Sequence, residues 1–311
     1  MNLKMQPDYP VIAFDVGGTD IKSTFVDAEG NIRQIRRTPT PRSNNAVNDI
    51  LDTLSGIHAD YVAELEIPAI SVGLAVPGLV DEKSGIAHYS ANIGWQDTPL
   101  RAWAQDRLGM PVALCHDVRS AAVAESRFGA GIDSEHMLAV VIGTGIASTL
   151  VIQGSAYLGS GTAGEIGHGV FDPAGPPCGC GSRGCLENIV SARAMLTAYE
   201  MATGELLDGA KDLISRAASG DKDAKSIWAE SVRSLAVALT RICTVIAPDT
   251  VVIGGGISRA GDALFLPLRE HFESFMGRFP KPLIVPATLG DDAGLIGSLY
   301  TAQQLAKQLH S

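Results

Sequence analysis

A short segment in the middle of the chain, residues 164–187, constrains the fold more than any other feature. Three of the five cysteines, Cys178, Cys180 and Cys185, fall within eight positions of one another, and His168 stands ten residues upstream of the first. One imidazole and three thiolates form a complete tetrahedral zinc set with no position left for water. The pattern therefore predicts a structural zinc; a chance group of thiols or a redox set is the alternative interpretation.

The composition is that of an acidic globular protein. The chain has 311 residues, of which 46% are hydrophobic and 19% charged, which leaves room for two domains of about 150 residues. The formal net charge of -10 disfavours nucleic acid and anionic membranes as partners. We find neither the apolar core of a signal peptide nor a run of about 18 apolar residues. Clustered cysteines favour a reducing cytoplasm.

A unit of strand, glycine turn, strand and second turn occurs twice, about 125 residues apart by the positions of its strands. In order, the copies are residues 10–16, 17–19 and 21–26 with turn residues at 27–31, and residues 137–142, 143–145 and 146–152 with turn residues at 153–154. A third strand is expected at 32–38. Such a duplication predicts two similar α/β halves that face each other.

The remaining pattern alternates between strands and helices. The expected strands are 69–76, 112–115, 250–253 and 283–286. The expected helices are 44–66, 98–108 with Thr98 as N-cap, 120–128, 192–201, 211–219, 224–247 and 294–308. We expect the last helix to pack back on the first domain.

Three glycine turns, at residues 17–18, 143–145 and 254–256, each follow an apolar strand. Glycine lets backbone N–H groups approach a phosphate without interference from a Cβ atom. A single turn of this kind is a weak signal, but three in a duplicated α/β frame favour a nucleotide site. Neither the Walker spacing nor the G-x-G-x-x-G fingerprint is present.

Two aspartates stand at strand ends, where open α/β sheets bind their ligands. Asp15 ends the first strand and could order a water on Mg²⁺, hold the loop or simply initiate a turn. Asp117 follows the strand at 112–115 and precedes a helix, so that it could be a general base or an N-cap. Both interpretations of Asp117 stay open from the residues alone.

Other polar side chains could bind a ligand. Glu165 and His168 are three positions apart, a spacing that one helical turn places on the same face. If His168 binds zinc through one nitrogen, the other can hydrogen-bond to a ligand. Asn92, near Trp95, could bind a polar ligand or form an Asx-turn.

Together these segments resemble the ROK family of bacterial sugar kinases and repressors, from Ile12 to about Leu305. The resemblance rests on DVGGT at 15–19, AVPGLVD at 75–81, NIGW at 92–95, HDVRSAAVAE at 116–125, GTG at 143–145, GEIGH at 164–168, CGCGSRGCLE at 178–187 and GGGI at 254–257. It implies an actin/hexokinase-like fold, in which two α/β domains with ribonuclease-H-like cores flank a cleft. We place a smaller domain at 1–117, onto which 295–311 packs back, and a larger one with the zinc loop at 118–294.

The resemblance also implies an ATP- and Mg²⁺-dependent hexose kinase that phosphorylates the sugar 6-hydroxyl and forms a homodimer. Asp117 would be the catalytic base. The sugar would contact Asn92, Asp117, Glu165, His168 and Glu187, and zinc would be held by His168, Cys178, Cys180 and Cys185. ATP would be bound by Asp15, Gly17, Gly18, Thr19, Gly143, Thr144 and Gly145, with Gly254, Gly255 and Gly256 near the adenosine.

Several alternatives remain within this resemblance. Glucose is the first candidate substrate, and N-acetylmannosamine or another N-acetylhexosamine the second; polyphosphate is a possible donor. A repressor would carry an N-terminal helix-turn-helix of roughly 70 residues, whereas the first strand here begins by residue 11. A non-catalytic sugar-sensing protein is a remote alternative, which the intact Asp117 disfavours. The chain departs from the family at Asp20, at His116, Val118 and Arg119 of the N-D-A-N motif, and at residues 147–149.

Overall fold

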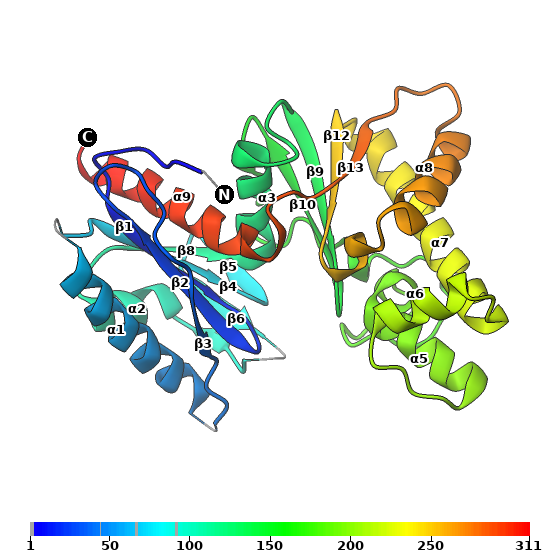
Figure 1. Ribbon diagram of the computed structural model, residues 1–311, viewed down its shortest axis with the longest axis horizontal. Coiled ribbons are helices and arrows are strands. Elements are labelled where there is room, and N and C mark those ends of the chain that lie inside the picture. Colours follow the sequence, from blue (N-terminus) through cyan, green and yellow to red (C-terminus); the bar gives the residue numbers. More distant parts are fainter. Residues whose placement is uncertain (1–2, 44, 66–67, 91–92) are drawn as a thin grey trace. The chain divides into compact units, whose positions relative to one another are not determined.

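The computed structural model describes residues 3–43, 45–65, 68–90 and 93–311. These residues fold as two compact units (Figure 1). The first contains the described residues of Met1–Ala124 together with Gly159–Thr162 and Asp291–Ser311, and the second contains Glu125–Leu158 and Ala163–Gly290. The boundaries drawn from the sequence, 1–117 with 295–311 and 118–294, stay a prediction about folding domains.

A five-stranded sheet forms the centre of the first unit, in the order β3-β2-β1-β4-β8. Its strands are β1 (Val11–Val16), β2 (Asp20–Val26), β3 (Arg36–Pro39), β4 (Ser71–Val76) and β8 (Val112–His116). The first three form an antiparallel meander, and β4 and β8 run parallel to β1. Every residue of β1 and β4 is buried, as expected for strands that are covered on both faces.

Helices cover both faces of this sheet (Figure 1). On one face lie α1 (Ala46–Glu64) and α2 (Leu100–Leu108), and the stripe Ile50, Leu51 and Leu54 of α1 joins the core. On the other lies α9 (Ala293–Leu309), which approaches β4 so closely that a Cβ atom on Gly73 would stand 2.0 Å from the carbonyl oxygen of Ser298. Because side chains alternate along β1, Ile12 and Phe14 join the α1 core, and Asp15 lies against Gly294 of α9.

A small second sheet in this unit was not expected from the sequence. It consists of β5 (Leu79–Asp81), β6 (Ile86–Tyr89) and β7 (Gln96–Thr98). The predicted N-cap at Thr98 is wrong, because Thr98 ends β7 and its hydroxyl group hydrogen-bonds with the backbone of Gln96. Helix α2 instead begins at Leu100, after Pro99. The third strand also begins later than expected, because Ile32 forms only an isolated bridge with Val26 before pairing resumes at Arg36.

The second unit repeats the plan of the first. Its sheet has the order β11-β10-β9-β12-β13, built from β9 (His136–Ile142), β10 (Ile146–Ile152), β11 (Ser155–Ala156), β12 (Thr250–Gly254) and β13 (Leu283–Pro286). The strands β9, β10 and β11 are antiparallel, and β12 and β13 run parallel to β9. Strand order and direction therefore match the first sheet, which confirms the structural duplication.

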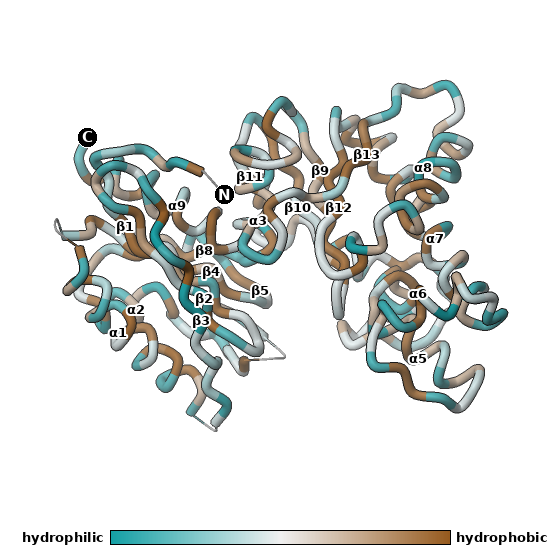
Figure 2. The backbone as a smooth tube through the Cα atoms, in the orientation of Figure 1, coloured by the Kyte–Doolittle hydropathy of each residue, from teal (hydrophilic) through white to brown (hydrophobic). Residues whose placement is uncertain are grey.

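The helices of the second unit pack into one apolar core with this sheet; the hydrophobic colouring in Figure 2 follows the buried strands. They are α4 (Glu187–Val190), α5 (Ala192–Thr203), α6 (Ala210–Ala218), α7 (Lys222–Ile246) and α8 (Asp262–Met276), with short 3-10 turns η1 (Ile166–His168), η2 (Gly256–Ala260) and η3 (Gly290–Asp292), the last of which straddles the boundary between the units. Helix α3 (Asp117–Phe128) also spans that boundary. Side chains of Ser191 and Asp221 cap α5 and α7.

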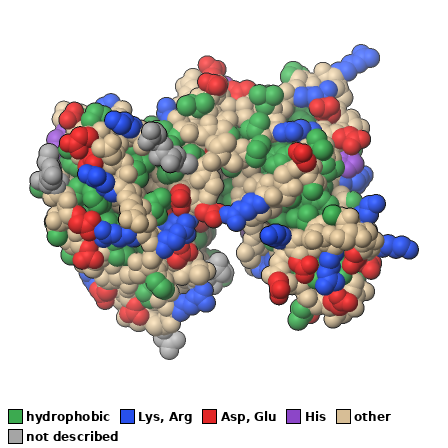
Figure 3. All heavy atoms as spheres, viewed as in Figure 1, with side chains coloured by type: hydrophobic (Ala, Val, Ile, Leu, Met, Phe, Trp, Pro, Cys, Tyr) green, Lys and Arg blue, Asp and Glu red, His purple; other side chains and the backbone are tan. Residues whose placement is uncertain are grey.

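The surface mixes charges of both signs, as the face drawn in Figure 3 shows. Within the described part of the chain, none of the helices has both the length and the apolar character needed to cross a bilayer.

Candidate active site and metal centre

Asp117 is the first residue of α3 and directly follows β8. The backbone N–H of Val118 donates to its Oδ1 at 2.7 Å. Burial of the carboxyl raises the pKa of Asp117 to about 6, although the positive charges of Lys22 and Arg119 oppose this shift. The side chain is still 34% exposed, so that a ligand can reach it. A carboxylate with a pKa close to the working pH is suited to accept a proton.

A second carboxylate, that of Asp15, lies at the end of β1 and is only 8% exposed. Burial raises the pKa of Asp15 to about 6, with Lys22 opposing the shift and the charge of Asp117 adding to it. Lys22 is its cross-strand neighbour on β2, and the ammonium group lies 3.3 Å from Oδ2. Lys22 also donates to the carbonyl oxygen of Asp291. One edge of this sheet thus holds two carboxylates and a lysine.

Residues that follow β3 brace the first glycine turn. The hydroxyl group of Thr40 donates to the carbonyl oxygen of Gly17 at 2.7 Å. The backbone N–H of Thr40 donates to the carbonyl oxygen of Thr19 at 3.0 Å. Arg42 donates to the carbonyl oxygen of Gly18 at 3.0 Å. With the carbonyls held from this side, the turn has a fixed shape.

The structure also accounts for Asp20, the carboxylate that departs from the family pattern beside this turn. Arg37 bridges two acidic groups, with Nη1 at 3.0 Å from Asp20 and Nη2 at 3.1 Å from Asp292. The charge of Asp20 is therefore balanced by a guanidinium group within the same unit.

The four predicted zinc ligands come together in the second unit. The ligand atoms of His168, Cys178, Cys180 and Cys185 all lie within 4.8 Å of one another. Cys180 Sγ is 3.7 Å from Cys185 Sγ, and Cys178 Sγ is 3.7 Å from His168 Nδ1. A tetrahedral zinc with Zn–S bonds of about 2.3 Å requires edges of about 3.8 Å. The residues present therefore fit zinc, with Nδ1 as the histidine ligand atom.

The protonation of one of these thiols depends on whether a cation is present. Burial and the two neighbouring thiols raise the pKa of Cys185 to about 12, so that the thiolate form is disfavoured without a positive charge nearby. A bound divalent cation reverses this preference and deprotonates its thiol ligands. The spacing of the four ligand atoms is the observation that fits a metal ion at this cluster.

The loop that carries Glu165 and His168 packs directly on β10. The N–H of Ser148 donates to the carbonyl oxygen of Gly164 at 2.8 Å. A Cβ atom on Gly167 would lie 2.3 Å from the carbonyl oxygen of Ile146, which explains the glycine at this position. Glu165 immediately precedes the turn η1 and His168 ends it.

Glu187 lies against the second glycine turn. Its Oε2 accepts from the N–H of Ile146 at 3.2 Å, and its Oε1 pairs with Arg193 at 2.9 Å. A Cβ atom on Gly145 would stand 2.5 Å from Oε2. The predicted sugar carboxylate and the predicted phosphate turn Gly143, Thr144 and Gly145 are therefore adjacent within this unit.

The third glycine turn ends β12. Gly254 is the last residue of the strand, Gly255 has a φ of 81°, and Gly256 begins η2. A Cβ atom on Gly255 would lie 2.3 Å from the carbonyl oxygen of Ile142, so that both its conformation and its surroundings require glycine.

Each unit thus holds part of the predicted site. Asp15, Gly17, Gly18, Thr19 and Asp117 lie in the first unit, and the zinc ligands, Glu165, Glu187 and the other two glycine turns lie in the second. The predicted ligand residue Asn92 lies outside the described residues. Sequence reasoning missed Lys22, which the two-residue alternation along β2 could have identified as a partner of Asp15, and Arg193.

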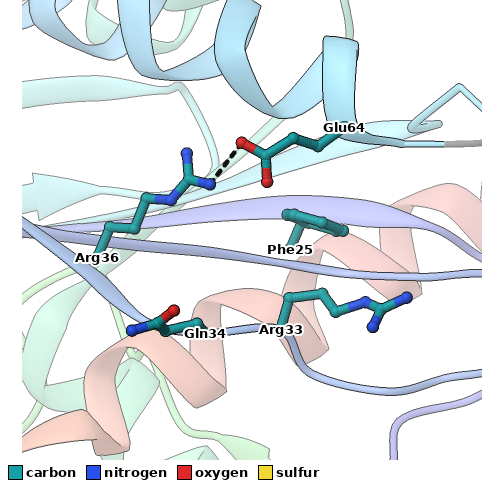
Figure 4. Close-up of a pocket in the computed structure, with 5 residues that line it drawn as sticks. All are labelled: Phe25, Arg33, Gln34, Arg36 and Glu64. Carbon is teal, nitrogen blue, oxygen red and sulfur yellow. Dashed lines mark hydrogen bonds and ion pairs between the residues drawn. The ribbon is translucent and has the colours of Figure 1, made fainter.

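A pocket of about 480 Å³ lies elsewhere in the first unit (Figure 4). It is lined by Phe25, Arg33, Gln34, Arg36 and Glu64 and contains none of the predicted site residues. Its two arginines are already paired, Arg36 with Glu64 and Arg33 with Asp27. We therefore assign it no part in the site.

Comparison with known proteins identifies the family. The ROK family model matches residues 11–305, so that the chain belongs to the ROK family. A glucokinase of Halalkalibacterium halodurans is 33% identical over 321 residues, and the match covers 94% of each chain. An N-acetylmannosamine kinase of Escherichia coli is 33% identical over 300 residues, which cover 94% of this chain and 98% of that one.

Solved structures agree on the fold. The crystal structure of a ROK family glucokinase from Streptomyces griseus, in complex with glucose and AMPPNP, matches with a TM-score of 0.79 at 30% identity. The match covers 95% of this chain and 99% of that one. The predicted mixed α/β fold of the actin/hexokinase type is therefore confirmed.

Proposed function

We propose that this ROK sugar kinase transfers the γ-phosphoryl group of ATP to the 6-hydroxyl group of a hexose, with glucose as the first candidate. The observation that carries the proposal is Asp117, a reachable carboxylate whose pKa is raised to about 6 at the start of α3. The glucokinase relative at 33% identity supports the reaction class, and the Streptomyces griseus complex with glucose and AMPPNP supports the pair of substrates.

In this proposal, Asp117 accepts the proton of the 6-hydroxyl group while that oxygen attacks the γ-phosphorus atom. The new O–P bond forms as the bond to ADP breaks, and the proton then passes from Asp117 to solvent. Phosphoryl transfer needs a positioned base and charge neutralisation more than covalent chemistry. Mg²⁺, when bound with ATP, would offset the phosphate charge, and Asp15 is the residue that would hold it through a water molecule.

Sugar binding is assigned to Glu165, His168, Glu187 and Asn92, together with Asp117. Because His168 Nδ1 faces the cysteine cluster, Nε2 is the nitrogen left to donate to a sugar hydroxyl group. The zinc centre would hold the imidazole in one orientation. The backbone of the three glycine turns is assigned to ATP.

Three reduced thiols at the cysteine cluster are consistent with a cytoplasmic location.

N-acetylmannosamine is the second candidate, because the Escherichia coli relative of that name is as similar in sequence as the glucokinase. The two sugars differ at the 2-position, so that a panel separates them. We would measure kcat/KM with ATP for glucose, mannose, N-acetylglucosamine and N-acetylmannosamine, and for glucose with polyphosphate. We expect glucose with ATP to lead by at least about tenfold, which is about 1.4 kcal/mol of transition-state binding.

A higher kcat/KM for N-acetylmannosamine would replace glucose and keep the reaction. A protein that binds a sugar but releases no ADP with any of the four would instead be a non-catalytic sugar-sensing member of the family.

A further inference from the structure

The proposed base is bracketed by hydrogen bonds to a single carboxylate oxygen. Glu82 Oε1 accepts from the backbone N–H of His116 at 3.0 Å, and from the guanidinium group of Arg119 at 3.0 Å. His116 precedes Asp117 and Arg119 follows it by two positions. One oxygen atom therefore holds the chain on both sides of Asp117.

Arg119 extends this clamp to two further segments. Its Nη1 donates to the carbonyl oxygen of Val80 on β5 at 3.2 Å, and its Nη2 donates to that of Gly161 at 2.5 Å. Arg119 is only 4% exposed, so that these bonds replace the hydration of Nη1 and Nη2, whereas Nε is buried without a hydrogen-bond partner. Gly161 belongs to the short segment Gly159–Thr162, which is part of the first unit, and it stands four positions before Glu165 in the sequence.

The turn that presents Glu82 is itself ordered. Asp81 ends β5, and its Oδ1 accepts from the N–H groups of Lys83 at 2.9 Å and Ser84 at 3.2 Å. These two bonds form an Asx-type turn that fixes the backbone around Glu82. Glu82 is 18% exposed at its side chain and is thus largely withdrawn from solvent.

We propose that Arg119 and Glu82 are positioning residues that hold Asp117 in its catalytic orientation. The inference rests on the proposed function, because it assigns a role relative to the base of that reaction. Arg119 acts through the backbone of α3 and through Glu82, and it contacts neither substrate in this account.

The energetic reason is the steep dependence of phosphoryl transfer on geometry. A displacement of about 1 Å at the reacting groups can lower a rate by about 100-fold. The planar guanidinium fork binds Glu82, Val80 and Gly161 at fixed angles, which a lysine ammonium group cannot reproduce. Removing either partner would also leave the other charge without its buried counterpart.

The test compares kcat and KM in Arg119→Gln, Arg119→Lys, Glu82→Gln and the double variant Arg119→Gln/Glu82→Gln, using glucose and ATP. We expect kcat to fall by about 10- to 100-fold in Arg119→Gln, with both KM values within about twofold. Arg119→Lys should recover part of the loss. Because the two residues share a contact, the loss in the double variant should be smaller than the product of the two single losses.

Arg101→Gln is the matched control. Arg101 donates to the backbone of the same turn, to the carbonyl oxygens of Lys83 at 3.2 Å and of Glu82, but not to the segment around Asp117. We expect it to keep the wild-type kcat. Where Arg119→Gln does not fold, as judged by its melting transition, Glu82→Gln and Arg119→Lys carry the test.

An unchanged kcat in folded Arg119 and Glu82 variants, or losses equal to that of Arg101→Gln, would overturn the positioning role alone. A wild-type protein that is inactive with all four sugars of the panel would overturn the proposed function and this inference with it, so that the two failures are distinguishable.

Discussion

At the scale of single residues, the proposed site contains two carboxyl groups whose pKa is raised. Asp15 and Asp117 both have a pKa of about 6, and in each case burial is the main cause. A carboxyl group whose pKa is raised by burial destabilises the folded protein at neutral pH, but it is suited to proton transfer. The positive charge of Lys22 lowers both pKa values and so reduces this destabilisation.

We expect Asp117→Asn to lower kcat by about 100- to 10,000-fold, because general-base assistance contributes a factor of that size. The Kd of the sugar should change by less than about fivefold, since an amide keeps a hydrogen bond of about 1 kcal/mol. Steady-state kinetics and calorimetric titration measure the two quantities. Asp106→Asn, an exposed position on α2, is the control. A kcat within threefold of wild type would remove the base assignment.

The pH dependence of kcat should report the ionisation of Asp117. The base works only when ionised, and its pKa is about 6, so that kcat should be level above about pH 7 and fall as the pH drops below 6. In Asp117→Asn the residual activity should lose this acid limb. A wild-type profile that stays flat down to pH 4.5, at saturating substrates and with intact fold, would contradict the raised pKa.

The thermal stability of the protein should depend on pH in the opposite direction from kcat. The pKa of Asp117 in the folded protein is above the ordinary value of 3.8, so that folding is favoured by protonation and the contribution is lost as the pH rises through about 6. We therefore expect Asp117→Asn to melt at a higher temperature than wild type at pH 8 and at a similar temperature at pH 4. Melting curves at both values test this, and a variant that melts lower at pH 8 would contradict it.

At the scale of elements, we propose that the segment with the cysteine cluster links metal binding to sugar binding. The cysteine cluster, the turn η1 and Glu187 are parts of one loop that packs on β10. We expect Cys180→Ser to reduce the bound zinc from about one per chain to well below half, and to raise the KM for the sugar by about 10-fold or more. Elemental analysis of protein purified without chelators gives the stoichiometry.

Cys243→Ala is the control for that experiment, because Cys243 is a buried cysteine of α7 outside the cluster. It should retain zinc and the sugar KM. Wild-type protein that contains no zinc would count against the metal centre, whereas a zinc-free Cys180→Ser variant with normal sugar KM would separate the metal from sugar binding.

The contact between α9 and β4 makes a separate stability prediction. Because a Cβ atom on Gly73 would stand 2.0 Å from the backbone of Ser298, Gly73→Ala should destabilise the protein by about 1–3 kcal/mol or more. Gly56→Ala is the matched control: Gly56 lies inside α1 with nothing within 4 Å, and alanine should stabilise the helix by up to about 1 kcal/mol. Chemical denaturation of both variants decides, and equal effects would contradict the close packing.

The elements also show what the sequence could predict. The long strands β1, β2, β9 and β10 and the helix α7 were predicted because their apolar periodicity extends over many residues. The three-residue strands β5 and β7 were not, since two or three alternating residues carry no periodic signal. Thr98 has a side chain that is common at N-caps, but its hydroxyl group accepts from the N–H of Gln96 within β7.

Some residues of the candidate site could be predicted from the sequence, and others could not. Local motifs predicted the zinc ligands and the glycine turns, because their spacing is short and their chemistry specific. Glu82 and Arg119 carry no local signal: they are 37 positions apart, and only the pairing of β4 with β8 beside the β5 turn brings them together. Lys22 and Arg193 were missed because a single cation in a strand or helix is usually a solvated surface residue.

At the scale of the whole molecule, we propose a homodimer on the basis of family membership. One chain has a mass of 32.5 kDa, so that light scattering of the eluted protein should give about twice that value. A mass of one chain at micromolar concentration, in protein with full zinc content, would contradict the proposal.

For the whole molecule, we propose that it phosphorylates the primary alcohol of a hexose. The most direct measurement is phosphorus and carbon NMR of the products formed from ATP and glucose, with 6-deoxyglucose in a parallel reaction. We predict ADP and a sugar phosphate whose carbon 6 couples to phosphorus, and no sugar phosphate from 6-deoxyglucose. Phosphate on another hydroxyl group, or equal turnover of 6-deoxyglucose, would contradict the account.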